Sequence, residues 1–260
     1  MSKKELNWLR SLNKKKGRRQ EKMYPAEGVR LLEEALASGC LPEKIYFAPS
    51  SLTERGKKLI ESYQKAQVET ISIPARQLDA VTDTKHSQGI LGVFAIKTGD
   101  PEKQLTAGHR KILVCDRIKD PGNLGTLMRS AAAFSFNLLI TTADSAETTN
   151  PKTIRGSMGS FFRLAIAENQ SVSGLIATLR QNNYRILVAA GGREKAHNKL
   201  NETDSLALVI GSEAEGVDPL WEQEADAVLS IPTTVAVESL NAAVAGSILM
   251  NRFYKSGREN

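Results

Sequence analysis

The sequence predicts an α/β protein of two domains, a small N-terminal α/β domain over residues 1–97 and a larger one over residues 110–260 with a mostly parallel sheet. Three observations predict this fold. A chain of 260 residues is too long for one small core. Strand-like runs alternate with helical periodicity, which is typical of parallel strands joined by helices. A polar stretch containing Gly and Pro, residues 98–109, is predicted to be the linker.

The elements of the first domain follow from periodicity and helix-boundary residues. Residues 26–39 place apolar side chains at helical spacing and end in a glycine, which predicts an amphipathic helix. Ser51 and Glu54 have the spacing of a capping box, so a helix is expected to open there and to run to about Lys65. A short helix is expected after Pro74, and strands are expected at 44–48, 68–73 and 89–97.

The second domain is predicted to begin with a buried strand at 111–116, which leads into a loop and then a helix ending near residue 134. Ser171 is expected to cap a later helix. The chain is expected to close with a helix within 239–254. Further strands are expected at 137–142, 163–168, 184–190, 206–211 and 227–232.

Composition narrows the class of protein. The sequence is 41% hydrophobic and 25% charged, an ordinary globular balance, and no apolar run is long enough to cross a membrane. The N-terminus lacks the apolar core of a secretory signal, so a cytoplasmic location is expected. Cys40 and Cys115 lie far apart in apolar settings and predict no disulfide framework. Scattered histidines and the lack of CxxC predict no metal site.

Positive charge is concentrated at the N-terminus. Residues 1–30 contain ten Lys or Arg against three Glu, whereas the rest of the chain has 25 basic and 26 acidic residues. This placement indicates a polyanionic partner, because each neutralised phosphate releases counterions. A solvated basic tail is the alternative, and charge alone does not decide between them. The candidate contacts are Lys14, Lys15, Lys16, Arg18, Arg19 and Arg30.

Three loops that follow predicted strands carry unusual residues. They cover residues 120–125, 211–216 and 231–241. Ligands of open parallel sheets bind at the carboxyl ends of the strands, so these loops could line one pocket. Each loop alone is weak evidence, because turns are rich in Gly, Pro and Asn. The sequence contains neither GxGxxG nor GxxxxGK[ST], which disfavours a dinucleotide or P-loop site.

Taken together, the loops resemble the motifs of the SpoU (TrmH-like) family in the SPOUT superfamily of RNA methyltransferases. The three motifs are DPGNLGTLMRSA from Asp120, LVIGSEAEG from Leu208, and IP at 231 followed by ESLNAAVA from Glu238. Residues 152–159 match an auxiliary segment of the family. The N-terminal part is similar to the substrate-binding domain that precedes many members, a domain resembling small ribosomal RNA-binding proteins.

The resemblance implies a specific activity. It implies transfer of a methyl group from S-adenosylmethionine to a ribose 2′-hydroxyl, with ribosomal RNA preferred to transfer RNA because of the N-terminal domain. It also implies a deep trefoil knot and a homodimer whose interface holds the active site. The family's cofactor contacts, mostly made by backbone groups, correspond to Gly211, Ile231 and Leu240.

The chemistry of the reaction assigns roles to the catalytic residues that the resemblance implies. A ribose hydroxyl is a poor nucleophile, which must lose its proton as it attacks. The resemblance places Arg129 at this hydroxyl. Because arginine is effectively always protonated, we interpret it as an electrostatic stabiliser of the developing alkoxide rather than a base. Residues expected to orient the reacting groups or to contact phosphate are Asn123, Glu213, Ser239, Asn241 and Arg155.

Simpler interpretations stay open for several of these residues. Arg129 could form a surface salt bridge, Glu213 could cap a loop, and Asn241 could cap the last helix. The whole chain could also be a non-catalytic RNA-binding or ribosome-assembly factor on the same scaffold, or a methyltransferase that protects an antibiotic site. The sequence departs from the family pattern at Thr233, Val235, Ala214 and Ser135, which put the loop shape and cofactor affinity in doubt but not the reaction.

Overall fold

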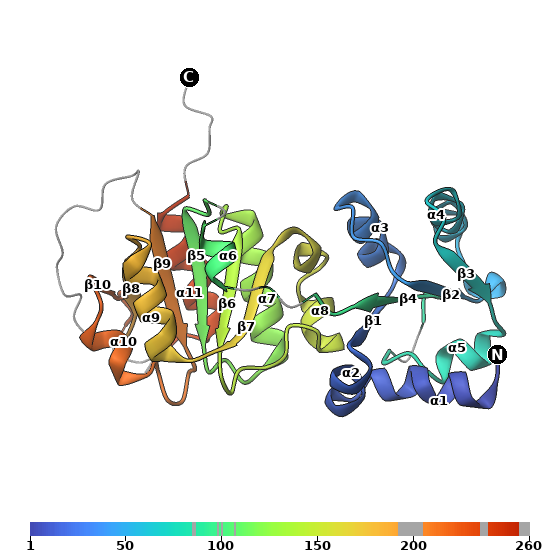
Figure 1. Cartoon of the computed structure of the whole chain (residues 1–260), viewed down its shortest axis with the longest axis horizontal. Coiled ribbons are helices and arrows are strands. Elements are labelled where there is room, and N and C mark those ends of the chain that lie inside the picture. Colours follow the sequence, from blue (N-terminus) through green and yellow to red (C-terminus); the bar gives the residue numbers. More distant parts are fainter. Residues whose placement is uncertain are drawn as a thin grey trace, which may run out of the picture. The chain divides into compact units, whose positions relative to one another are not determined.

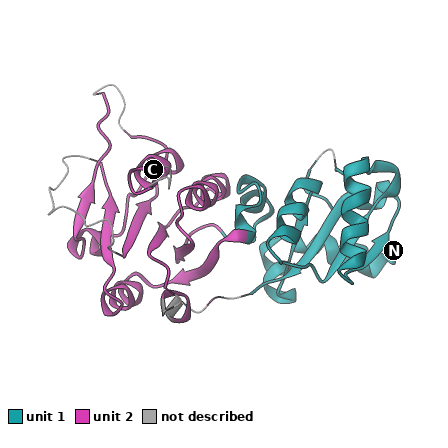
Figure 2. Ribbon diagram, turned by 90° about the horizontal axis from the view of Figure 1, so that it is seen from above, with its two compact units in different colours: residues 1–97, 147–162 teal, residues 98–146, 163–260 magenta. Residues whose placement is uncertain are grey.

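The chain forms two compact units (Figure 2). The computed structural model describes residues 1–84, 87–97, 99, 101–106, 108–191, 205–234 and 239–254. Unit 1 consists of residues 1–97 and 147–162, and unit 2 of residues 98–146 and 163–260. The segment 147–162 therefore packs with the N-terminal part, although the sequence places it between two strands of the C-terminal part.

Unit 1 is built on a mixed four-stranded sheet of order β1-β4-β2-β3 (Figure 1). The central strand β4 is antiparallel to β1 and β2, whereas β2 and β3 are parallel. The strands are β1 (Met23–Glu27), β2 (Lys44–Phe47), β3 (Glu69–Ser72) and β4 (Ile90–Ala95). The helices are α1 (Lys3–Leu12), α2 (Lys15–Glu21), α3 (Val29–Ala37), α4 (Glu54–Lys65), α5 (Ala75–Asp79) and α8 (Pro151–Gly156), with short 3-10 turns η1 (Pro49–Ser51) and η2 (Ser160–Arg163).

The α4 helix begins at a different cap from the one predicted. Thr53 is the N-cap, and its hydroxyl accepts a hydrogen bond from the Gly56 amide at 3.3 Å. Ser51 instead ends η1, so the capping box predicted at Ser51 and Glu54 is wrong. The reason is local: Pro49 starts a separate turn that moves the first helical residue two positions along the chain.

The basic N-terminal region is part of the folded unit. Residues 3–27 form α1, α2 and β1, and Leu9 and Leu12 lie buried in a core cluster with Tyr46. The α1 and α2 helices pack so closely that a Cβ on Gly17 would lie 2.1 Å from the Ser11 carbonyl oxygen. A solvated tail is therefore wrong for this region, because its apolar residues contribute to the core.

An aromatic cluster attaches the segment 147–162 to the sheet of unit 1. Phe161 lies edge-on to Tyr24 of β1 with ring centroids 5.4 Å apart. Phe162 lies 5.2 Å from Phe94 of β4, and Tyr24 and Phe94 stack on each other. Aromatic pairs at these separations add to the apolar area that they bury. The segment therefore completes the core of unit 1.

Unit 2 is a parallel six-stranded sheet of order β10-β8-β9-β5-β6-β7, which confirms the predicted sheet. The strands are β5 (Lys111–Asp116), β6 (Leu138–Thr142), β7 (Ala165–Gln170), β8 (Arg185–Ala189), β9 (Leu206–Gly211) and β10 (Ala227–Leu229). The helices are α6 (Pro101–Thr106), α7 (Pro121–Ala133), α9 (Val172–Gln181), α10 (Pro219–Gln223) and α11 (Ala242–Arg252). The α6 helix lies within the stretch predicted as a linker.

Helices cover both faces of this sheet (Figure 1). Alternate strand residues such as Val114 and Val209 pack in one core cluster with α9 and with Trp221 of α10. On the other face, Ile210 of β9 lies against Gly246 of α11, and α11 packs on α7. Burial on both sides explains why these strands read as nearly continuous apolar runs.

Three sequence-based expectations concern features of the whole chain. The trefoil knot involves the path of the C-terminal loops, and residues 192–204 and 235–238 lie outside the described residues, so the knot stays a prediction. Within the described ranges, no helix has the length and apolarity to span a bilayer. The same ranges contain no group of His, Cys, Asp or Glu arranged to hold a metal ion.

Candidate active site

The first motif forms the N-cap and most of α7, so residues 121–125, which were expected in a loop, are helical. Asp120 caps this helix, and its carboxylate accepts a hydrogen bond from the Asn123 amide at 2.8 Å. Pro121 occupies the first turn, where its missing amide proton is not needed. The cap places α7 directly after the carboxyl end of β5 and presents the Asn123 side chain on its first turn.

Asn123, Glu213 and Asn241, one from each of the three motifs, meet in one hydrogen-bonded network. The Glu213 Oε1 atom accepts from Asn123 Nδ2 at 2.7 Å, from Asn241 Nδ2 at 2.9 Å and from the Ala242 amide at 3.0 Å. Asn241 Nδ2 also donates to Asn123 Oδ1 at 2.9 Å. Hydrogen bonds to a carboxylate are stronger than neutral ones, so this network fixes the three motifs relative to each other.

Asn241 has the capping role that the sequence left open, and it joins the network as well. It is the N-cap of α11, and its Oδ1 accepts from the amides of Ala243 and Val244 at 3.0 and 3.2 Å. Its Nδ2 faces Glu213 and Asn123. Because each end of the amide has a different task, substitution would disturb both the helix start and the network.

Arg129 lies on the exposed stripe of α7. Gly122, Thr126, Arg129 and Ala133 recur at helical spacing and are all exposed. Among the described residues, Arg129 has neither a hydrogen-bond partner nor an ion-pair partner, so the salt-bridge interpretation gains no support there. The helix itself is anchored, because Ser130 and Ser247 of α11 share a hydroxyl hydrogen bond of 2.6 Å. A fixed helix thus presents a guanidinium that pairs with none of the described residues.

The second motif is a tight loop at the end of β9. Ser212 and Gly216 pair through two backbone hydrogen bonds of 2.9 and 3.2 Å, and Gly216 has a positive φ of 65°. A Cβ on Gly211 would lie 2.3 Å from the backbone carbon and oxygen of Gly216. Glycine is therefore required at 211, because a side chain there would push the loop apart.

Comparison with known proteins assigns the chain. Residues 110–251, more than half of the sequence, match the SpoU rRNA Methylase family, and residues 3–92 match the MRM3-like substrate binding domain. The chain belongs to the SpoU rRNA methylase family. The predicted enzyme class, an S-adenosylmethionine-dependent RNA methyltransferase with a separate substrate-binding domain, is that of this family and is confirmed.

Relatives align over most of the chain. The 23S rRNA (guanosine(2553)-2′-O)-methyltransferase RlmP of Bacillus subtilis is 29% identical over 241 residues, which cover 93% of this chain and 92% of that protein. The human mitochondrial rRNA methyltransferase 3 is 30% identical and covers 86% of this chain, but only 65% of its own length is matched. The crystal structure of the SpoU methyltransferase AviRb from Streptomyces viridochromogenes with AdoMet has a TM-score of 0.83 at 22% identity, covers 97% of both chains, and shares the fold.

The cofactor residues implied by the SpoU family lie near the carboxyl ends of unit 2 strands. Gly211 ends β9, Ile231 follows β10, and Leu240 precedes the cap of α11; all three are half-buried. Within the described ranges, no backbone hydrogen bond links Ile231 or Leu240 to another residue. Backbone groups of Ile231 and Leu240 that bond to none of the described residues, together with the close backbone packing at Gly211, fit a ligand held by main-chain contacts.

Charged residues that the sequence did not single out hold the second-motif loop. Glu215 accepts from Lys119 Nζ at 2.5 Å and lies 3.5 Å from Arg117. The hydrogen bond from Lys119, together with the charges of Lys119 and Arg117, lowers the pKa of Glu215 from its ordinary value. The fully buried Asp116 accepts from the Asp218 amide and from Thr142, both at 2.7 Å. Asp116 ends a buried apolar run in the sequence, and a charged residue in that position indicates a buried carboxylate with specific hydrogen-bond partners.

Other positions at which the sequence departs from the family pattern lie mostly on the surface. Thr233 and Ala214 are exposed. Ser239, a predicted catalytic residue that matches the third motif, is exposed as well. Ser135 follows α7 with a φ of 61°, a left-handed conformation that the family's usual glycine would adopt without strain. Val235 and Glu238 lie outside the described residues.

The candidate RNA contacts all lie in unit 1, and one of them is buried. Lys14, Lys15, Lys16, Arg19 and Arg30 are exposed, as a phosphate contact requires. The Arg18 side chain is only 3% exposed; it donates to the Leu12 and Asn13 carbonyls and pairs with Glu147. The prediction that Arg18 contacts RNA is therefore wrong for this fold, because its donors are used inside the unit.

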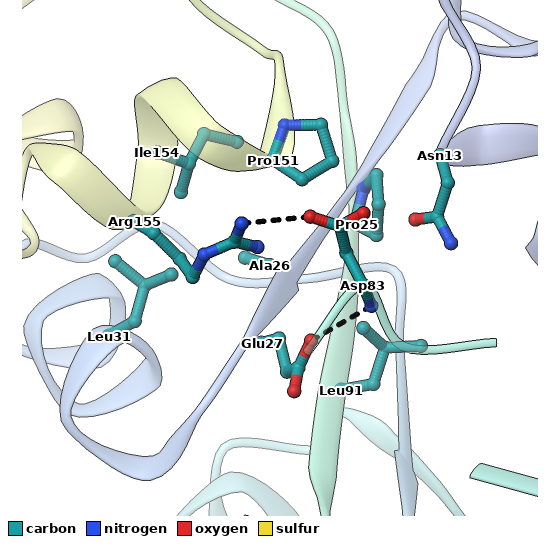
Figure 3. Close-up of a pocket in the computed structure, with 10 residues that line it drawn as sticks. All are labelled: Asn13, Pro25, Ala26, Glu27, Leu31, Asp83, Leu91, Pro151, Ile154 and Arg155. Atoms are coloured by element: carbon teal, nitrogen blue, oxygen red, sulfur yellow. Dashed lines mark hydrogen bonds and ion pairs between the residues drawn. The ribbon is translucent and has the colours of Figure 1, made fainter. Parts of the chain in front are cut away.

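Arg155 lines a small hollow in unit 1 (Figure 3). Its guanidinium donates to Asp83 Oδ2 at 2.8 Å, and the Asp83 amide donates to Glu27 at 3.2 Å. The hollow has about 10 Å³ of free space, which is room for roughly one water molecule. The hollow is too small for a nucleotide or a cofactor. The hydrogen bond from Arg155 to Asp83 joins α8 to the loop that contains Asp83.

Proposed function

We propose that this protein transfers a methyl group from S-adenosylmethionine to a ribose 2′-hydroxyl of ribosomal RNA. The Asn123–Glu213–Asn241 network carries the proposal, because it joins all three family motifs through side chains suited to positioning polar groups. The MRM3-like domain and the two relatives named for ribosomal RNA favour that substrate. The bacterial relative favours action in the cytoplasm.

The residues supply the requirements of an in-line displacement. Bound S-adenosylmethionine supplies an electrophilic methyl group, and the backbones of Gly211, Ile231 and Leu240 would hold it. The Arg129 guanidinium would stabilise the negative charge that develops on the ribose oxygen as the hydroxyl proton passes to solvent water. The oxygen would take the methyl group as the carbon–sulfur bond of the sulfonium breaks, which leaves a neutral thioether. The Glu213 network keeps Asn123 and Asn241 in fixed positions for the ribose, which lowers the entropic part of the barrier.

The rival function is a non-catalytic RNA-binding factor on the same scaffold. Such a factor has no need to keep a carboxylate that accepts three hydrogen bonds between separate motifs. It also has no need of an arginine on the exposed stripe of α7 that pairs with no other residue in the described part of the chain. These two features favour the enzyme.

Methyl transfer from labelled S-adenosylmethionine to ribosomal RNA tests the proposal. The wild type is expected to label RNA at a ribose 2′-oxygen, located by mapping 2′-O-methyl groups. Glu213→Ala is expected to lower turnover by roughly tenfold or more, because Asn123 and Asn241 lose a charged acceptor. Glu222→Ala, which removes an exposed carboxylate of α10, is the matched control. Labelling by Glu213→Ala at the wild-type rate would reject the network as the active site.

We also propose that the protein is a homodimer whose interface includes α11. Val244 and Ile248 lie one turn apart on α11 and are 47% and 39% exposed. Exposed apolar residues on a helix beside the candidate site suit an interface that covers them.

A charge placed on that face should separate the subunits. Ile248→Glu is expected to shift the protein from dimer to monomer in light scattering and to abolish most methyl transfer. Leu41→Glu, which alters an apolar residue of unit 1 that is 47% exposed, should leave the dimer intact. A dimer that persists in the Ile248→Glu and Val244→Glu variants would place the interface elsewhere.

A further inference from the structure

A single carboxylate of unit 1 gathers three basic side chains. Glu147 pairs with Arg18, with Arg19 at 2.9 Å and with Lys15 at 3.9 Å. Three cations against one anion leave an excess of positive charge at this point. Arg18 is buried behind the pair, whereas Lys15 and Arg19 are 58% and 57% exposed. The excess charge therefore lies on the solvent side.

The way that Arg19 meets Glu147 leaves most of its donors available. Arg19 donates from Nε to Glu147 Oε1, and within the described ranges its two terminal nitrogens make no hydrogen bond. The guanidinium is planar, so a carboxylate on the Nε side fixes the direction of the opposite edge. That edge carries paired donors whose spacing matches two phosphate oxygens.

The backbone around Glu147 is also fixed. Its carbonyl oxygen accepts from Thr153 at 3.1 Å, and the segment is joined to the sheet of unit 1 through Phe161 and Phe162. The α2 helix that carries Lys15 and Arg19 is held against α1 at Gly17. Glu147 and the two cations thus lie on two segments of unit 1, and each segment is held in place by its own packing contacts.

We propose that Glu147 is a positioning residue for an RNA phosphate site in which Arg19 and Lys15 bind a backbone phosphate. This inference rests on the proposed function and names part of its RNA contact. Sequence alone does not suggest it, because an acidic residue in an RNA-binding surface reads as unfavourable charge. Glu147 lowers the local net charge by one, but it also holds the Arg19 guanidinium in a fixed direction. We expect this orientation to favour phosphate binding.

The test uses a substitution for which net charge and orientation predict opposite changes in RNA affinity. Glu147→Gln raises the net charge by one, so charge alone predicts tighter binding of a ribosomal RNA fragment. Orientation predicts binding about tenfold weaker, with the salt slope reduced by about one. Glu61→Gln makes the same charge change at an exposed site on α4 and should bind at least as tightly as the wild type. Binding by Glu147→Gln equal to that of Glu61→Gln would overturn the inference.

Glu147→Gln also removes the charged partner of the buried Arg18, which could destabilise unit 1. Two further variants therefore test the inference without disturbing that pair. Arg19→Ala should weaken RNA binding more than Lys16→Ala, which removes an equal, exposed charge that has no ion pair with Glu147 among the described residues. In the Arg19→Ala background, adding Glu147→Gln should cause no further loss of RNA affinity. Equal losses of RNA affinity in Arg19→Ala and Lys16→Ala would overturn the inference. Binding is measured without cofactor, so a wild type that binds RNA but transfers no methyl group contradicts the proposed function alone.

Discussion

Arg129→Ala is expected to lower the turnover of RNA methylation on the order of a hundredfold or more, the effect of removing a donor that stabilises an oxyanion. Arg129 is exposed on a helix fixed by the Asp120 cap and the Ser130–Ser247 hydrogen bond, so its removal should leave the fold intact. Affinity for S-adenosylmethionine should change little, because the proposed cofactor contacts come from other loops. Single-turnover methylation and calorimetric cofactor titration measure the two effects separately.

Arg129→Lys tests whether the planar fork matters beyond its charge. It should recover only part of the lost rate, because an ammonium group offers a different donor geometry. In the wild type and in this variant the rate should rise with pH, as expected when loss of the hydroxyl proton is the difficult step. A folded Arg129→Ala protein that methylates at the wild-type rate would show that the residue has a structural role only.

Gly211→Ala is expected to weaken S-adenosylmethionine binding by roughly tenfold to hundredfold. The new Cβ would lie 2.3 Å from the backbone of Gly216 and 2.5 Å from the Val217 amide nitrogen, and backbone cannot turn aside as a side chain can. Overpacking of this kind costs about 1–3 kcal/mol, which corresponds to that change in affinity. The Ser212–Gly216 pairing should open, and the backbone groups beside the cofactor should move with it.

Gly191→Ala is the matched control for this substitution. Gly191 follows the neighbouring strand β8, and a Cβ there would meet no atom of the described residues within 4 Å. It should bind cofactor like the wild type in the same calorimetric titration. Equal cofactor affinities of the two alanine variants would remove Gly211 from the cofactor site.

Of the described elements, the sequence by itself predicted every strand except β1, and it predicted the helices α3, α4, α5, α7, α9 and α11. The motifs that it shares with the SpoU family contain the three residues of the Glu213 network. These features can be predicted because they depend on short stretches of sequence. Apolar periodicity indicates a strand or a helix, and each motif is recognised from residues at a fixed spacing. The motifs therefore point to Asn123, Glu213 and Asn241, and the structure brings these residues within hydrogen-bond distance of one another. Their mutual contact follows from the parallel sheet, whose strands end at one edge.

Tertiary structure alone decided the roles of the basic residues and of the segment 147–162. Arg18 and Arg19 are adjacent in the sequence and read alike, yet Arg18 is buried and Arg19 is exposed. Their common partner Glu147 lies 129 and 128 residues away, beyond any local pattern. Which arginine is buried depends on where α2 packs and which carboxylate arrives beside it. The physical reason is that periodicity reports the face of an element, whereas the partner of a charge is fixed only when distant segments pack together.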